Sequence, residues 1–174
     1  MNILALDLST KNSGYAIFKE DKLIQFDSFS ASSTDVIKRI QRMTDNIYSL
    51  LEHLDFQIDK IIIEEILPKH NQYGVGNLHT QKVLSWLQAS IIFMLHDDFS
   101  NIDIEYFYPS EWRALCNIKN GRGIKRNEEK ELDIKCAKKL YNIEKNIDDD
   151  TADAICIGHA YIIKNKENET ISWE

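Results

Sequence analysis

The sequence predicts an α/β domain, a mixed five-stranded sheet flanked by helices. Three short apolar runs separated by turn residues open the chain, stretches of helical and strand character then alternate, and the last third is helical. A β-meander followed by alternating helices and strands is typical of such a sheet. At 174 residues the chain suits one domain, residues 1–174, of which residues 165–174 form a polar C-terminal tail.

The first three strands come from the opening runs. Residues 2–8, NILALDL, form an apolar run of strand length, and the turn residues of STKNSG lead into a second strand, YAIF. A third strand covers about residues 22–28. Together they predict the meander.

The next segments alternate between two periods. From residue 33, apolar residues recur every three or four positions behind Ser, Thr and Asp capping candidates, which predicts a long amphipathic helix. The β-branched run of residues 60–66, KIIIEEI, predicts a buried strand. The loop of residues 67–77, a second amphipathic helix through residues 83–95 and a fifth strand, IDIEYFY, complete the pattern.

The remainder is helical. A short helix, PSEWRAL, precedes the glycine-containing loop NIKNGRG, a basic helix from about residue 125 to 141 and a last helix that starts in IDDDTADAICIGHAY. The polar tail follows.

Composition narrows the class of protein. Hydrophobic residues make up 43% and charged residues 28% of the chain, with no apolar run of membrane-spanning length and no signal-peptide pattern, so we expect a cytoplasmic protein with no membrane contact. The three widely spaced cysteines predict reduced core residues. The net charge of −7 speaks against nucleic acid. However, residues 113–139 hold nine basic and four acidic residues, which indicates either a basic stripe or a solvated helix face with mixed ion pairs.

Two acids lie inside the most apolar strands. Asp7 shares one face of its strand with Ile3 and Ala5, and Glu64 shares a face with Ile62. An unpaired carboxylate there costs several kcal/mol, so each acid must reach a strand end, a cationic partner or a metal.

Four more aspartates crowd the start of the last helix. Asp148 and Asp149 are explained as helix caps, whereas Asp150 and Asp153 are spaced i, i+3 and project from one face. The DDD run leaves the choice between Asp149 and Asp150 open. Carboxylates without a Cys/His cluster suit Mg²⁺ or Mn²⁺, and two such ions are the machinery of in-line phosphodiester displacement.

The three acidic motifs, DLSTKNSGYAIF, IIIEEI and DDTADAICIGHAY, resemble in order and spacing those of RuvC-type Holliday junction resolvases, which have the ribonuclease H-like fold. Within that family the resemblance is to RuvC-like endonucleases of the lactococcal-phage type. The resemblance covers residues 3 to about 163. It implies a catalytic, metal-binding set of Asp7, Glu64, Asp150 and Asp153, with two Mg²⁺ or Mn²⁺ ions per active site, and a supporting position for Glu65.

The resemblance also implies contacts to DNA. YPSEWRAL and GRGIKRNEEK are similar to the stretch that leads into the family's DNA-facing helix, so we expect DNA-binding residues here: Arg113, Lys119, Arg122, Lys125 and Arg126. The family's wedge aromatic after the glutamate motif is replaced by Leu67, with Tyr73 further along the loop as the other DNA-contacting candidate.

The expected function is metal-dependent, structure-selective endonuclease activity on Holliday junctions and other branched DNA, in recombination or phage DNA processing. The resemblance implies a homodimer, acting in the host cytoplasm if phage-encoded. Two alternatives stay open at this point. DLSTKNSG also resembles the phosphate loop of actin-like and sugar-kinase ATPases, although these need two lobes, and an inactive junction-binding protein would use only the basic segment.

Overall fold

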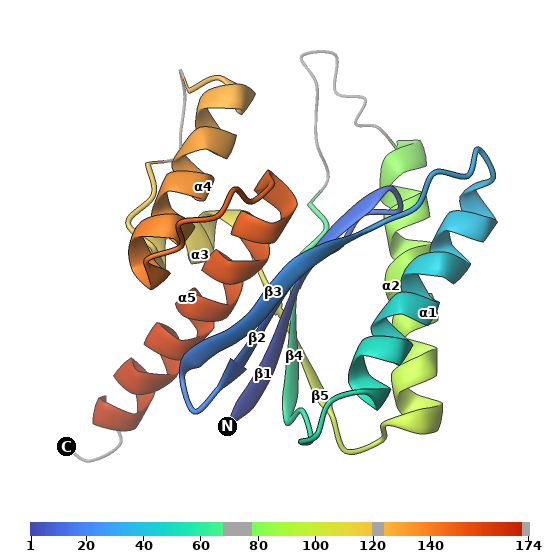
Figure 1. Ribbon diagram of the computed structural model, residues 1–174, viewed down its shortest axis with the longest axis horizontal. Helices are drawn as coiled ribbons and strands as arrows, with labels where there is room; N and C mark the ends of the chain where they lie inside the picture. The colour runs from blue at the N-terminus through green and yellow to red at the C-terminus, as the bar shows by residue number, and fades with distance from the viewer. Residues whose placement is uncertain (68–77, 120–123, 172–174) are drawn as a thin grey trace.

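The computed structural model describes residues 1–67, 78–119 and 124–171, with side chains as far as residue 166. Its strands are β1 (Asn2–Asp7), β2 (Asn12–Lys19), β3 (Lys22–Ser30), β4 (Lys60–Glu64) and β5 (Asp103–Phe107). Its helices are α1 (Val36–Glu52), α2 (Leu78–Asp98), α3 (Pro109–Leu115), α4 (Arg126–Tyr141) and α5 (Asp149–Ile171). Figure 1 shows a central sheet between two helical layers.

The sheet has the strand order β3-β2-β1-β4-β5. β1, β2 and β3 form an antiparallel meander, while β4 pairs parallel with both β1 and β5. The predicted five-stranded mixed sheet is therefore confirmed. The three parallel strands end at one edge of the sheet, so side chains at their carboxyl ends lie close together.

Strand alternation divides the core between the two faces. Ile3 and Ala5 of β1 pack with α3 and α5, whereas Leu4 and Leu6 pack with α1 and α2. The helices accordingly cover opposite faces, α1 and α2 on one and α3, α4 and α5 on the other (Figure 1). Because Asp7 continues the register of Ile3 and Ala5, it belongs to the α5 side.

Two glycines let α5 lie directly on the sheet. A Cβ on Gly14 of β2 would overlap the backbone carbonyl of Asp150, and a Cβ on Gly158 would overlap the ring of Phe18. Both positions need a residue without a side chain because another group occupies that space. The first of them brings the start of α5 to the strand that pairs with Asp7.

The last helix is longer than expected. α5 runs to Ile171, through most of the segment that the sequence predicts as a polar tail. Apolar periodicity ends near residue 163, but Lys, Glu and Asn are compatible with a helix that leaves the core. Ion pairs along its last turns hold the helix to other elements: Lys164 pairs with Glu105 and Glu111, and Lys166 with Asp21.

The three cysteines are free thiols, as expected, and Cys116 and Cys156 are buried. They are not scattered, however. α3, α4 and α5 bring them together, with the Cys116 Sγ–H donating to the Cys156 carbonyl at 3.3 Å and the Cys136 Sγ–H to the Cys116 carbonyl at 3.6 Å. They serve as small side chains where three helices meet.

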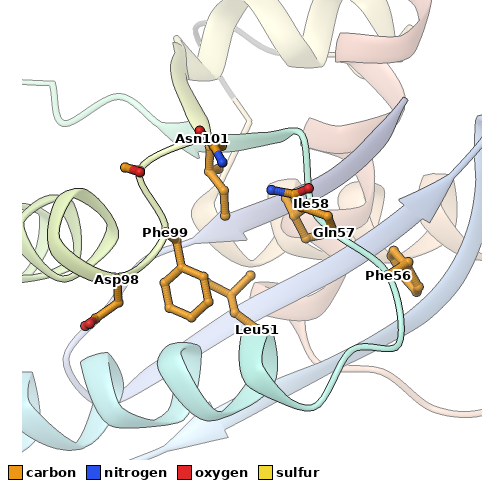
Figure 2. Close-up of a pocket in the computed structure, with 9 residues that line it drawn as sticks. Leu51, Phe56, Gln57, Ile58, Asp98, Phe99 and Asn101 are labelled. Atoms are coloured by element: carbon orange, nitrogen blue, oxygen red, sulfur yellow. The ribbon is translucent and has the colours of Figure 1, made fainter.

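A small pocket lies at the end of the sheet where the parallel strands begin (Figure 2). It measures about 220 Å³ and is lined by residues from the C-terminal ends of α1 and α2 and the loops that follow, among them Leu51, Phe99 and Asn101. No charged cluster accompanies it, and the predicted acidic site lies at the other end of β4. None of the helices in the described part of the chain is long and apolar enough to cross a membrane.

Candidate active site

Two strands carry the first two acids to one edge of the sheet. β1 and β4 are parallel neighbours, and their register pairs Leu6 with Ile63. Asp7 and Glu64 each follow by one residue, so both project from the carboxyl ends of adjacent strands on the same face. Of the three possibilities left open for these acids, the strand bounds show a strand end for both, which explains how apolar strands tolerate them.

The start of α5 carries the second pair. Asp150 and Asp153 lie in its first two turns, above the strand edge that holds Asp7 and Glu64. The close approach at Gly14 fixes this position, since Gly14 is the residue paired with Asp7 in the sheet. Residues more than 140 positions apart thus form one acidic group.

Burial and mutual repulsion dominate the electrostatics of Asp7. Burial raises the pKa of Asp7 well above its ordinary range, and the charges of Glu64, Asp150 and Asp149 raise it further, against a smaller lowering by Arg113. The carboxylates are therefore near enough to oppose one another's ionisation.

Asp153 shares this environment. Burial is the largest cause that raises the pKa of Asp153 well above its ordinary value. The charges of Asp7, Asp133 and Glu64 raise this pKa further, while Arg113 lowers it. Its Oδ1 atom is buried and has no hydrogen-bond partner among the described residues. A buried carboxylate oxygen without a partner is costly, so a ligand is expected there.

The neighbouring aspartates have separate partners. Asp148 accepts hydrogen bonds from the Thr151 backbone N–H at 2.9 Å and the Ser28 hydroxyl at 2.7 Å, and these bonds with that of Asn12 lower its pKa, although burial alone would raise it. The predicted capping role of Asp148 agrees with this geometry. Asp149 forms an ion pair with Lys130 of α4.

Asp150 faces the meander instead. Its Oδ2 accepts a hydrogen bond from the Asn12 side chain, and burial together with Asp149 and Asp148 raises its pKa. Asp149 is engaged by Lys130, and the charge of Asp150 raises the pKa of Asp7 more than that of Asp149 does, so Asp150 stays the candidate ligand.

An arginine lies between the acidic group and α4. Arg113 of α3 donates to Asp133 with its Nη2 at 3.0 Å and its Nε at 3.4 Å, and the same Nη2 lies 3.8 Å from Asp153 Oδ2. The Asp133 side chain is only 1% exposed, so its charge depends on this partner. Asp133 thereby fixes the guanidinium beside the buried carboxylate.

Trp112, adjacent to Arg113, reaches the other strand acid. Its ring is fully buried, and its indole Nε1–H donates to Glu64 Oε2 at 2.9 Å. The Arg113 guanidinium stacks over the same ring at 4.3 Å. One turn of α3 therefore orients both Glu64 and Asp153.

The donor set fits a hard divalent cation. Four carboxylates supply only oxygen ligands, and the Oδ1 of Asp153, which accepts no hydrogen bond from the part of the chain that the structure describes, is a further acceptor. As placed, no group of three or more His, Cys, Asp or Glu side chains in the described ranges is arranged to hold an ion. Because like charges separate when no cation lies between them, ligation would have to draw these side chains together.

The residues expected to contact DNA are placed unequally. Lys119, Lys125 and Arg126 are exposed, whereas Arg113 is largely enclosed by its acidic partners, with 18% of its side chain exposed. Arg122 and Tyr73 lie outside the described residues. Part of the basic segment forms ion pairs, as with Lys130–Asp149 and Lys135–Glu131. The segment therefore has features of a basic stripe and of a solvated helix face with mixed ion pairs.

Three residues that support the acidic group were not predicted from the sequence. Trp112 reads as an ordinary apolar residue of a short helix, and Asn12 as a turn residue. Asp133 had a usable signal, because it occupies the buried face of α4 together with Ala137. A single acid on an apolar helical stripe indicates a buried ion pair.

Residues 1–163 match the protein family described as DUF3882, Lactococcus phage M3 protein. The chain belongs to this family. No curated protein matches the sequence of this Lactococcus phage M3 family member.

Several solved structures resemble this chain over nearly its whole length. RuvC of Thermus thermophilus in complex with a Holliday junction substrate has a TM-score of 0.73 at 10% identity, covering 96% of each chain, and another structure of RuvC from that organism has 0.70 at 12%, covering 97% of each. The yeast mitochondrial Holliday junction resolvase Ydc2 has 0.54 at 15%, covering 99% of this chain and 84% of its own. At such identities the likeness concerns the fold, which is that of RuvC, ribonuclease H-like.

Proposed function

We propose that this protein is a metal-dependent endonuclease that cleaves Holliday junctions and related branched DNA. One observation carries the proposal: Asp7, Glu64, Asp150 and Asp153 surround the carboxyl edge of the sheet, where burial and repulsion raise the pKa of Asp7 and Asp153. Such a group is unfavourable by itself and becomes favourable around cations. The RuvC fold supports the choice of substrate.

The same four carboxylates are the proposed ligands of two Mg²⁺ or Mn²⁺ ions. Bound there, the cations would activate water and stabilise the leaving oxygen of an in-line displacement. Trp112 holds Glu64 at its indole N–H, and Arg113, fixed by Asp133, holds Asp153 and adds positive charge beside the reacting phosphate. Lys119, Lys125 and Arg126 would bind neighbouring backbone phosphates, so branch shape sets selectivity.

A homodimer is part of the proposal, because symmetrical resolution of a four-way junction requires two nicks and the described part of each chain has one such acidic group. α2 offers a surface for pairing. Trp86 and Phe93, spaced i, i+7 on one face, are 43% and 70% exposed, while Leu87 and Ile91 on the opposite face are buried. A second copy of α2 would cover this face.

The direct test incubates the protein with labelled four-way, three-way and linear duplex DNA in Mg²⁺. We expect cleavage of branched DNA only, abolished by Asp7→Asn and by Asp153→Asn while DNA binding survives. Asp45→Asn, at an exposed position of α1, is the matched control and should cut normally. Binding of junctions without any cutting, or ATP turnover in place of cutting, would overturn the proposal.

A further inference from the structure

A second basic site borders the acidic edge on the other side of the sheet from α4. An open hollow of about 500 Å³ lies where the β1–β2 turn meets the connection from β3 to α1. Its lining contains two basic and no acidic residues: Lys11, Ala31, Ser32, Ser33, Thr34 and Arg39. In a chain of net charge −7, a hollow with only positive charge is unusual.

The hollow is a built feature of the fold. The Ala31 backbone N–H donates to the Lys11 carbonyl at 2.8 Å, which joins the two loops. Arg39 reaches across from α1 and donates to the carbonyls of Ser33 at 2.8 Å and Thr34 at 3.2 Å. Neither Lys11 nor Arg39 forms an ion pair with a described residue, so their charges are available to an anion.

Its position relates it to the acidic group. Lys11 directly precedes Asn12, whose side chain binds Asp148 and Asp150, and it follows Asp7 by four residues. Four residues reach at most about 14 Å. With about 3.4 Å of rise per nucleotide, a phosphate at Lys11 would be within about four nucleotides of the phosphate at Asp7.

We propose that this hollow, through Lys11 and Arg39, binds a backbone phosphate of the DNA whose neighbouring phosphate is cleaved. The inference rests on the proposed nuclease function and adds a contact on the α1 face. DNA crossing the acidic edge would then be held from both faces of the sheet, by the α4 segment on one and by this hollow on the other. The serine and threonine hydroxyls of the rim are suited to the same phosphate.

The test measures junction binding by fluorescence anisotropy over a range of salt concentrations, in an Asp7→Asn background that prevents cutting. Lys11→Gln and Lys11→Glu change an exposed side chain, and Lys22→Gln, at the exposed first position of β3 at the opposite end of the sheet, is the matched control. We expect Lys11→Gln to weaken binding equally for junctions of different sequence and to reduce the slope of log K against log salt by about 0.9. Lys11→Glu should weaken it further, and the control should not change it.

Other outcomes separate the possible failures. If Lys119→Gln and Lys125→Gln weaken binding but both Lys11 variants bind with unchanged affinity and slope, this inference is wrong and the nuclease proposal stands. If the Asp7→Asn protein binds no DNA, both are wrong. A third outcome is that inorganic phosphate raises the melting temperature of the wild-type protein but not of the Lys11 variants, while DNA affinity is the same in both. The hollow is then a small-anion site and the inference is overturned.

Discussion

At the scale of single residues, the site combines groups that are costly alone. Asp153 has a buried oxygen without a partner in the described ranges, while a neighbouring turn of α3 supplies the cation that partly offsets its charge. The ion pair with Asp133 fixes the position of the Arg113 guanidinium. Arg113 is therefore a counter-ion for Asp153 and a donor in a fixed position. Buried carboxylates of this kind lower the stability of the folded protein, and such a loss is typical of functional sites.

Replacing Asp153 by Asn should stabilise the metal-free protein. Because the pKa of Asp153 is raised on folding, the folded state loses stability as the pH rises from about 4, the ordinary carboxyl value, through that raised pKa. The increase in melting temperature from Asp153→Asn should therefore be small near pH 4 and largest at neutral pH, a few degrees. Thermal denaturation in EDTA measures it.

Magnesium provides the complementary measurement. Mg²⁺ should raise the melting temperature of the wild-type protein, by mass action, and should do so much less for Asp153→Asn. Asp45→Asn, an exposed site, controls for charge. A variant that is destabilised in EDTA at neutral pH would contradict the repulsion described for this carboxylate.

Trp112→Phe tests the orientation of Glu64. The phenyl ring keeps an aromatic group in the buried position but lacks the N–H that donates to Glu64 at 2.9 Å. Loss of a hydrogen bond to a charged group should cost about 1.5–3 kcal/mol of unfolding free energy. The Mg²⁺ concentration that gives half-maximal cleavage should also rise, which a purely structural role would not produce. Tyr108→Phe, at an exposed aromatic position, is the control.

At the scale of elements, α5 is the decisive helix. It packs over β1 and β2, and its first turns bring Asp150 and Asp153 to the strand edge. The strands were predictable from local periodicity, as were the faces on which Asp7 and Glu64 lie. The contact of α5 with β2 could not be predicted, because no pattern in the sequence of α5 indicates that Gly14 lies against the Asp150 backbone.

Gly14→Ala should separate the role of this contact from packing in general. The added methyl group would overlap the Asp150 backbone and push the start of α5 away from Asp7, at a cost of about 1–3 kcal/mol. Gly158→Ala overlaps Phe18 further along the helix and is the matched control. Both should lower the melting temperature, but Gly14→Ala should lose far more cleavage activity. Equal losses at equal stability would refute the assignment.

At the scale of the whole molecule, charge and apolar surface are distributed unevenly. The acidic chain concentrates exposed basic residues on α4 and its N-terminal approach, and a second basic hollow lies across the sheet. The exposed aromatic face of α2 is separate from both. This division allows pairing of two chains without covering either basic surface.

The proposed dimer can be tested at α2. Phe93→Lys places a charge at the centre of the exposed face and should convert a dimer of about twice 20.3 kDa into a monomer. Sedimentation velocity at several protein concentrations measures the mass. Ile37→Lys, at an exposed apolar position of α1, should leave it unchanged. A wild-type protein that is monomeric at all concentrations would contradict the proposed pairing through α2.

The local spacing of apolar residues was enough to predict the order of the elements, the mixed sheet and the strand faces that carry Asp7 and Glu64. Only tertiary packing shows that Asp149 and Asp150 have different partners, that Trp112 and Asp133 support the acids, and that Arg113 lies between two carboxylates. Each of these depends on contacts between segments far apart in the chain. Periodicity reports which face of an element is buried, but only packing decides which buried groups meet.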